Sequence, residues 1–371
     1  MTKIFIILIS LFSVLLFENF SNAVAQEQDI GNDLDTLVTG LMQRNNLPSV
    51  VLAVFIPGKA EYIIVKGKAN LATGLDREAG DQYRIGSITK TFIATVILQL
   101  SDSGKISVSD KLSKWFPEFP NADIITINDL LMMRSGIYDS WDHEILEKYY
   151  KDPLINLTAD EMIRLSAEKP FEFKKPDTEG VYCNINYILL QEIIEKITDN
   201  KIATVLDEFI FKPLGMTKSI YPVTTNLPGN LHGYSWNYDT KLFEDKTLLN
   251  PDPVGGAGAI ISDIHDLNIY ARALYTGHNL LDPESQKQRL ESKPFKGIPD
   301  FIQYGEGIIK FGNFYGHNGT ICGFSSGMFY QPDNDATIIV SVSRLDLDDK
   351  SQSSVIFEEV AKYLFPNVVN W

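Results

Sequence analysis

Hydrophobic and polar positions follow two different periods along the chain, and these periods predict strands and helices in separate regions. Alternation with a period of two predicts strands near both ends: Val50 to Phe55, Tyr62 to Lys66, Ile308 to Phe311, Ser326 to Gln331 and Thr337 to Ser343. Spacings of three and four predict helices around Leu34 to Met42 and over Ser87 to Leu100, Thr126 to Met133, Tyr187 to Ile197, Ile202 to Phe211, Asp263 to Tyr275 and Ser351 to Leu364. Residues 222–254 are rich in Pro, Asn, Gly and Tyr and are predicted to be irregular.

The order of these segments predicts an α/β fold of the α+β type. Strands are expected at both ends of the chain and helices in the middle. We therefore predict an antiparallel sheet flanked by helices, built from residues 26–125 and 255–371, with a mostly helical sub-domain inserted over residues 126–254. A cleft where the two parts meet is the expected place for a site.

The first 25 residues have the composition of an export signal. Lys3 precedes a 14-residue apolar run from Ile4 to Phe17, and Ala23-Val24-Ala25 provides small residues for cleavage. An uncleaved membrane anchor is the alternative, but 14 apolar residues are short for a membrane span. We expect an exported protein, periplasmic or secreted, with no stable membrane anchor after cleavage.

Composition narrows the classes of partner and cofactor. The chain is 44% hydrophobic and 22% charged, which is typical of a folded globular protein. Its net charge of −15 argues against a nucleic-acid partner, whose phosphates it would repel. The five histidines are scattered and no Gly-rich phosphate loop is present, so we predict no metal and no other cofactor. Cys183 and Cys322 are better explained as buried thiols than as a disulfide framework. The sequence does not predict an oligomeric state.

Ser87 and Lys90 are the first candidate catalytic pair. They lie three residues apart at the start of a long apolar helix, so both side chains are expected on one face. A serine hydroxyl needs a base to remove its proton, and a lysine becomes that base when burial lowers its pKa. The same spacing recurs at Ser166 and Lys169, but Pro170 follows directly and no apolar helix comes after it.

Two later motifs supply groups that suit acyl transfer. Tyr182 and Asn184 form the only Tyr-x-Asn of the chain. A tyrosine hydroxyl relays protons, and an asparagine amide both donates and accepts hydrogen bonds. His317-Asn318-Gly319-Thr320 lies between two predicted strands. It is either a hairpin turn or a strand edge at which a substrate docks and a backbone amide contributes to an oxyanion hole.

These three motifs, in this order, resemble the penicillin-recognising serine hydrolases, which include class C β-lactamases, serine D-alanyl-D-alanine carboxypeptidases and related esterases. The likeness extends over about residues 35–345. Further matching segments are Ile125 to Leu131, Ser135-Gly136-Ile137, Pro213 to Met216, Gly256 to Ser262 and Tyr315 to Gly319. The resemblance implies that Ser87 is acylated, that Lys90 takes its proton and that Tyr182 passes a proton to the departing group.

The resemblance also implies substrate-binding roles. Asn184 would hold the acylamide group of the substrate, His317 and Gly319 would line the strand edge, and Thr320 would give the second oxyanion amide. A carboxypeptidase of this family usually offers a cation to the substrate carboxylate, and here only Lys310 precedes the third motif. His317 stands where a typical class C β-lactamase has lysine, and Cys183 stands where serine is usual.

Four functions follow from these observations. The first, which we favour at this point, is an exported serine hydrolase that forms an acyl-enzyme and hydrolyses D-alanyl-D-alanine peptides of the cell wall, as a carboxypeptidase does. Its partner would be a small-molecule or peptide substrate, either a D-alanyl peptide or a β-lactam. The second is a class C-type β-lactamase, which differs in how fast the acyl-enzyme is hydrolysed. The third is an esterase or D-amino-acid amidase on the same scaffold. The fourth, a catalytically silent binding protein, is disfavoured because Ser87, Lys90 and Tyr182 are all present.

Overall fold

A computed structural model describes residues 29–59, 61–173, 176–346, 351–369 and 371. The predicted export signal, residues 1–25, lies outside these residues. Within the part of the chain that the structure describes, none of the helices has the length and apolar character of a membrane-spanning segment.

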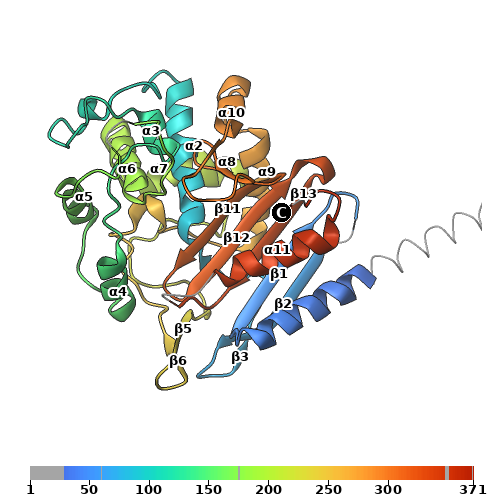
Figure 1. The fold of residues 1–371 in the computed structure, drawn as a ribbon. Coiled ribbons are helices and arrows are strands. Elements are labelled where there is room, and N and C mark those ends of the chain that lie inside the picture. The colour runs from blue at the N-terminus through green and yellow to red at the C-terminus, as the bar shows by residue number, and fades with distance from the viewer. Residues whose placement is uncertain (1–28, 60, 174–175, 347–350, 370) are drawn as a thin grey trace, which may run out of the picture.

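A large antiparallel sheet forms the centre of the molecule (Figure 1). Among the described residues it has nine strands in the order β3-β2-β1-β13-β12-β11-β10-β9-β8. The two ends of the chain meet where β1 pairs with β13, with Val50 opposite Val342. The strands of this sheet are β1 (Ser49–Phe55), β2 (Tyr62–Asn70), β3 (Leu75–Asp76), β8 (Lys293–Pro294), β9 (Ile302–Tyr304), β10 (Ile309–Phe311), β11 (Phe314–Ile321), β12 (Phe324–Gln331) and β13 (Ala336–Val342).

Helices cover both faces of the sheet, so its central strands are apolar on both sides. Alternate residues of β1 enter two different cores because successive side chains of a strand point to opposite faces. Leu52 packs with the helix over residues 29–44 and with α11 (Gln352–Leu364), whereas Ala53 packs with α2 (Thr89–Asp102). Figure 1 shows α11 and the first helix on the face nearest the viewer.

The remaining helices are α3 (Ile127–Leu131), α4 (His143–Lys151), α5 (Ala159–Ala167), α6 (Ile185–Thr198), α7 (Ile202–Leu206), α8 (Lys212–Leu214), α9 (Ile264–Thr276) and α10 (Pro283–Leu290). In Figure 1, the helices α3 to α7 lie on the side of α2 that is farther from α11, whereas α8 to α10 lie on the side of α2 that is nearer the sheet. The shorter elements are η1 (Gly86–Ile88), η2 (Leu112–Lys114), η3 (Asp207–Phe211), η4 (Gly255–Ala257), η5 (Pro332–Asn334) and the strand pair β4 (Tyr83–Arg84) and β7 (Ile261–Ser262). The sequence-based prediction of an antiparallel sheet flanked by helices and built from both chain ends is confirmed.

Several local expectations differ from the structure. The segment predicted to be irregular contains a hairpin, β5 (Tyr234–Asn237) and β6 (Leu242–Asp245), whose strands are too short to show a period. The helix expected to begin at Ser87 starts as the 3₁₀ turn η1, and α3 stops at Leu131 because Met133 has a φ of 58°. The helix expected over Ile202 to Phe211 ends in the π-helical turn η3. The proposed limits of the inserted sub-domain stay a prediction.

Candidate functional site

The Ser87 hydroxyl and the Lys90 amine lie together where the turn η1 runs into α2. Lys90 Nζ is 2.9 Å from Ser87 Oγ, 2.8 Å from Asn184 Oδ1 and 2.7 Å from the carbonyl oxygen of Ala257. Lys90 is fully buried, and Ser87 is partly exposed. The local spacing predicted from the sequence therefore brings the Lys90 amine and the Ser87 hydroxyl into contact, because the 3₁₀ turn keeps residues three apart on one side.

The buried setting of Lys90 favours its neutral form. Loss of hydration lowers the pKa of Lys90 to about 7, and the charge of Asp139 acts in the opposite direction. Near neutral pH a large fraction of molecules therefore holds an uncharged amine beside Ser87. Such an amine is able to remove the serine proton.

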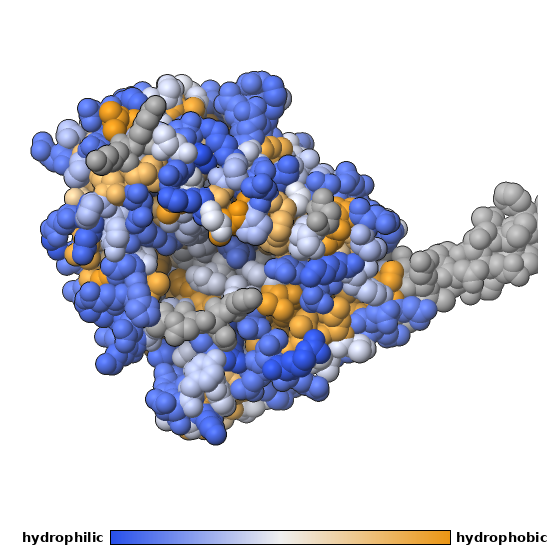
Figure 2. Space-filling view, viewed as in Figure 1, coloured by the Kyte–Doolittle hydropathy of each residue, from blue (hydrophilic) through white to orange (hydrophobic). Residues whose placement is uncertain are grey.

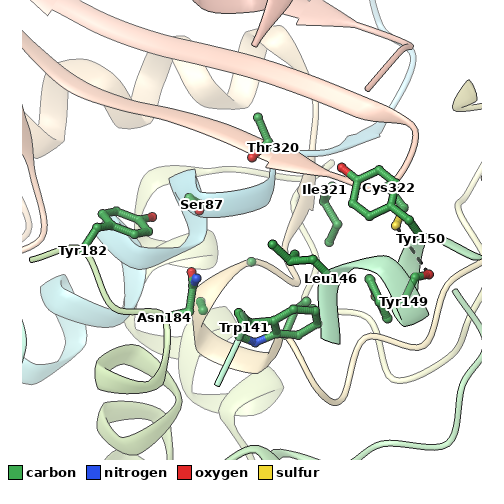
Figure 3. Close-up of a pocket in the computed structure, with 13 residues that line it drawn as sticks. Ser87, Trp141, Leu146, Tyr149, Tyr150, Tyr182, Asn184, Thr320, Ile321 and Cys322 are labelled. Carbon is green, nitrogen blue, oxygen red and sulfur yellow. Dashed lines mark hydrogen bonds between the residues drawn. The ribbon is translucent and has the colours of Figure 1, made fainter. Parts of the chain in front are cut away.

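Tyr182 approaches the same pair from the segment before α6. Its ring centroid is 4.9 Å from Lys90 Nζ, and its hydroxyl points toward Ser87 in Figure 3. Although 36% of the residue is exposed, desolvation raises the pKa of Tyr182 well above its usual value, with Tyr304 acting in the same direction and a hydrogen bond with Ser87 opposing it. Tyr182 therefore keeps its proton over the working pH range and is able to donate it.

Asn184 joins Lys90 to a residue that the sequence analysis missed. The Asn184 side chain accepts from Lys90, and its Nδ2 donates to Asp139 Oδ2 over 2.8 Å. The backbone N–H of Asn184 donates to the same oxygen over 3.0 Å. Asp139 lies two residues after Ser135-Gly136-Ile137, one of the segments that match the family. No spacing in the sequence links Asp139 with Asn184, because the two residues meet only through tertiary packing.

His317 is a buried, neutral residue close to Lys90 and Tyr182. Only 1% of it is exposed, and desolvation, followed by the charge of Lys90, lowers the pKa of His317 to about 3. Its Nδ1 faces the carbonyl oxygen of Asn318, and its Nε2 lies 3.2 Å from the Tyr304 hydroxyl. We assign the proton to Nδ1, since a carbonyl oxygen accepts only, and Tyr304 then donates to Nε2.

The third motif lies in the strand β11 and presents an unpaired edge. Residues 317–321 pair with β12, and among the described residues no strand pairs with them on the other side. Gly319 meets η1 there: a Cβ at Gly319 would lie 1.9 Å from the carbonyl oxygen of Ile85. Gly86 has a φ of 53°, and a Cβ on it would lie 2.7 Å from the Thr320 nitrogen. The two glycines thus let Ser87 and Thr320 line one cavity.

That cavity, of about 210 Å³, lies next to Ser87 and has one polar and one aromatic end. Figure 3 shows Tyr182 and Asn184 at one end of the cavity, which we call the polar end. Trp141, Tyr149 and Tyr150 lie at the other end, which we call the aromatic end. Figure 2 shows this face of the molecule hollowed, with hydrophobic residues in the hollow. The lining residues are Ser87, Trp141, Leu146, Tyr149, Tyr150, Tyr182, Asn184, Val254, Ala257, Gly258, Thr320, Ile321 and Cys322.

Not all predicted site residues reach the cavity surface. Ser87, Tyr182, Asn184 and Thr320 line it, whereas Lys90, His317 and Gly319 lie behind the lining. The predicted cation, Lys310, lies elsewhere on the sheet, with its Nζ 5.9 Å from the centroid of the Tyr315 ring.

The described lining residues include no lysine or arginine. Sequence reasoning also missed the aromatic wall, since a tryptophan and tyrosines at helical spacing are typical of any core. Both cysteines are free and buried, as expected. In the described part of the chain no three His, Cys, Asp or Glu side chains are placed to hold a metal ion.

Comparison with known proteins gives consistent similarities over most of the chain. The sequence profile of the beta-lactamase family matches residues 34–360. Penicillin-binding protein 4* of Bacillus subtilis (strain 168) is 24% identical over 354 residues, which are 89% of this chain and 75% of that protein.

Two solved structures have closely similar folds. The D-stereospecific amidohydrolase from Streptomyces sp. is 26% identical with a TM-score of 0.78, covering 92% of this chain and 98% of that one. The D-amino acid amidase from Ochrobactrum anthropi SV3, complexed with L-phenylalanine amide, is 23% identical with a TM-score of 0.80, covering 91% and 99%.

Proposed function

The chain belongs to the beta-lactamase family, and from that premise we propose that it hydrolyses amides or esters of D-amino acids through an acyl-enzyme on Ser87. Its homologues and structural neighbours are serine hydrolases, so the chain is a serine hydrolase of the β-lactamase and penicillin-binding protein fold. The family resemblance inferred from the three motifs is thereby confirmed. Its substrate, leaving group and residue roles belong to the proposal.

In the proposed reaction, Lys90 removes the Ser87 proton while Ser87 Oγ forms a bond to the substrate carbonyl carbon. The backbone amides of Ser87 and Thr320 stabilise the oxyanion that develops. Tyr182, which keeps its proton, passes that proton to the departing amine or alcohol and is reprotonated from Lys90. Water then hydrolyses the acyl-enzyme by the reverse transfers. The contacts of Lys90 with Ser87 and Asn184 support this sequence.

One observation carries the choice of substrate: the wall of the cavity is aromatic and apolar. Trp141, Tyr149 and Val254 lie there, and no described lining residue carries a positive charge. A substrate carboxylate would lose its hydration in this cavity without gaining an ionic partner, which is unfavourable. A neutral amide or ester leaving group and an apolar or aromatic amino-acid side chain fit the cavity better. The names of the two similar solved structures support D-amino acid derivatives.

A D-alanyl-D-alanine carboxypeptidase is the second candidate. The similarity to penicillin-binding protein 4* over 89% of the chain favours it, and the missing cation at the cavity disfavours it. A class C-type β-lactamase uses nearly the same residues and would differ in faster release of a penicilloyl group.

The test compares hydrolysis of D-phenylalanine amide, L-phenylalanine amide and a D-alanyl-D-alanine peptide by the purified protein, with Ser87→Ala as control. We expect the D-amide to be cleaved with the highest kcat/KM and the control to be inactive. A higher kcat/KM for the peptide would replace the proposal with the second candidate. Rapid nitrocefin turnover would indicate the lactamase, and equal activity of the control would overturn all three.

We also propose that residues 1–25 direct export to the periplasm or the medium, because Lys3 is followed by the apolar run from Ile4 to Phe17 and by the small residues Ala23-Val24-Ala25. Expression of the full chain in a bacterium with cell fractionation tests this. Mature protein outside the cytoplasm, with its N-terminus near Gln26, supports it, and uncleaved protein in the cytoplasm contradicts it.

A further inference from the structure

We propose that Asp139 is a positioning residue of the active site: through the Asn184 amide it holds the Lys90 amine with its lone pair directed at the Ser87 hydroxyl. The inference rests on the proposed function, in which Lys90 is the base, and it deepens that function. The hydrogen bonds of Asp139, Asn184 and Lys90 support it.

Asp139 faces hydrogen-bond donors on both carboxylate oxygens. Oδ2 accepts from the Asn184 backbone N–H over 3.0 Å and from Asn184 Nδ2 over 2.8 Å, and Oδ1 accepts from the Trp141 N–H over 3.3 Å. Three donors converge on it, and a protonated acid would place its own hydrogen against one of them. The arrangement therefore suits an ionised carboxylate, although burial raises the pKa of Asp139 above its usual value.

The carboxylate fixes which way round the Asn184 amide lies. With Nδ2 bound to Asp139, Oδ1 faces Lys90 Nζ at 2.8 Å. Turning the amide over would place its carbonyl oxygen against a carboxylate and its N–H groups against the amine. The first contact would be repulsive, and in the second the amide N–H groups would occupy the lone pair of the amine. Asp139 therefore selects one orientation of the Asn184 amide.

That orientation decides where the Lys90 lone pair points. A neutral amine has two hydrogens and one lone pair, and it has three polar neighbours. Asn184 Oδ1 and the Ala257 carbonyl oxygen, at 2.8 and 2.7 Å, only accept, so they take the two hydrogens. The third neighbour, Ser87 Oγ at 2.9 Å, carries a hydrogen that the lone pair is then able to accept. The proton moves from Oγ to Nζ as Oγ bonds to the substrate.

Asp139 is also the charged group that acts on Lys90. The titratable groups around the amine come from α6 and the segment before it, from β11, and from the loop that holds Asp139; among those the structure describes they are Asp139, Tyr182, Cys183, Tyr187 and His317. The tyrosines and the thiol have pKa values raised by burial, and His317 has one lowered to about 3. All four are neutral near pH 7, which leaves the Asp139 carboxylate as the counter-charge.

The first experiment measures kcat/KM of Asp139→Asn against D-phenylalanine amide from pH 5 to 9. We expect a plateau lower by about 10- to 100-fold, because the amine is no longer aligned, and an acid limb moved down by about one pH unit, because the counter-charge is gone. Asp142→Asn is the matched control, because Asp142 lies three residues from Asp139 and caps the N-terminus of α4, where asparagine caps equally well. The acid limb of the pH profile of Asp142→Asn should stay where it is in the wild type.

Two further variants separate orientation from charge. Asp139→Glu keeps the charge and should retain the wild-type acid limb at a reduced plateau. In an Asn184→Ala background, Asp139→Asn should shift the limb but lower the plateau by less than twofold. A limb that stays in place in Asp139→Asn would overturn the inference, since a merely structural residue lowers activity without changing the pH at which the base titrates.

A titration that needs no turnover keeps this test separate from the proposed function. Protein labelled with ¹³C at the lysine ε-carbon reports Lys90 directly, with Lys90→Met for assignment. We expect Lys90 to titrate near pH 7 in the wild type and about one unit lower in Asp139→Asn. If no amide or ester is hydrolysed, the proposed function fails, yet an unchanged Lys90 titration alone would overturn the role of Asp139.

Discussion

The two ends of the cavity beside Ser87 are held in place by different forces. Behind the polar end, Lys90 has three partners between 2.7 and 2.9 Å, and each is fixed by a separate element. At the aromatic end, Trp141 and Tyr149 meet edge to face with centroids 5.1 Å apart, and one hydrogen bond joins the Tyr149 hydroxyl to the backbone at Asn250. Hydrogen bonds are directional, whereas apolar packing tolerates substitutions that conserve volume.

This difference suggests a division of work between the ends. We propose that the polar end determines which bond chemistry is possible, because moving one of its groups would break the proposed proton path. The aromatic end determines which side chain of a substrate is accepted, because it offers area without charge. Changes at the polar end should therefore reduce activity on every substrate, and changes at the aromatic end should reorder substrates.

Replacement of the nucleophile should have the largest effect. We expect Ser87→Ala to lower kcat by about 10³-fold or more on every amide and ester tested, because no acyl-enzyme forms. Release of phenylalanine from its D-amide measures this, with circular dichroism to show that the fold is kept. Residual activity within tenfold of the wild type would place the nucleophile elsewhere.

Removal of the Tyr182 hydroxyl should come next. Tyr182→Phe should lower kcat/KM by about 100-fold, the contribution of one positioned proton donor. Because the pKa of Tyr182 is raised well above its usual value, the wild type should show no basic limb from this group up to pH 10. A pH profile from 7 to 10 measures it. If the wild type loses activity above pH 8 and Tyr182→Phe does not, the Tyr182 hydroxyl ionises at a lower pH than we expect.

A change at the aromatic end should be smaller and selective. Trp141→Ala should raise KM for D-phenylalanine amide by about tenfold and that for D-alanine amide by less than about twofold, since only the larger side chain reaches the lost surface. Steady-state kinetics on both substrates measure the ratio. Trp115→Ala removes a tryptophan outside the cavity lining and serves as control. An equal loss on both substrates would contradict the division between the two ends.

The polar end should also have a measurable effect on stability. The pKa of Lys90 is about 7 when folded and about 10.5 when unfolded. Between these values the unfolded chain holds a proton that the folded chain lacks, so folding stability rises with pH. Compared with Lys90→Met, the wild type should gain about 1 kcal/mol in free energy of unfolding per pH unit from pH 7 to 10, and nothing below pH 7. Urea unfolding at each pH measures the free energy of unfolding of both proteins. If the two free energies change with pH in the same way, Lys90 stays charged in the folded protein.

Local parts of this site could be predicted from the sequence, and its long-range parts could not. Ser87 and Lys90 are three residues apart, so helical geometry alone brings them together. Tyr182 and Asn184 joined them only through resemblance to a family, because nothing in their spacing encodes contact with α2. Asp139 escaped notice for the same reason: it meets Asn184 45 residues along the chain.

The same distinction applies to the fold. Long apolar segments such as β1 and α2 were predicted close to their observed limits, because burial dominates their residues. The hairpin of β5 and β6 was not, since four-residue strands with exposed positions such as Leu242 show too little pattern. The Ala257 carbonyl, which completes the surroundings of Lys90, has no side-chain signature at all.

The close backbone contact of η1 with β11, made possible by Gly86 and Gly319, has a consequence for how the enzyme is made. The two amides that we propose to bind the oxyanion belong to residues 87 and 320. A nascent chain therefore contains Ser87 long before it contains the complete proposed oxyanion hole. During synthesis the incomplete chain should therefore not hydrolyse cellular amides and esters. Activity should appear only when one of the last strands docks, and its onset would report complete assembly of the sheet.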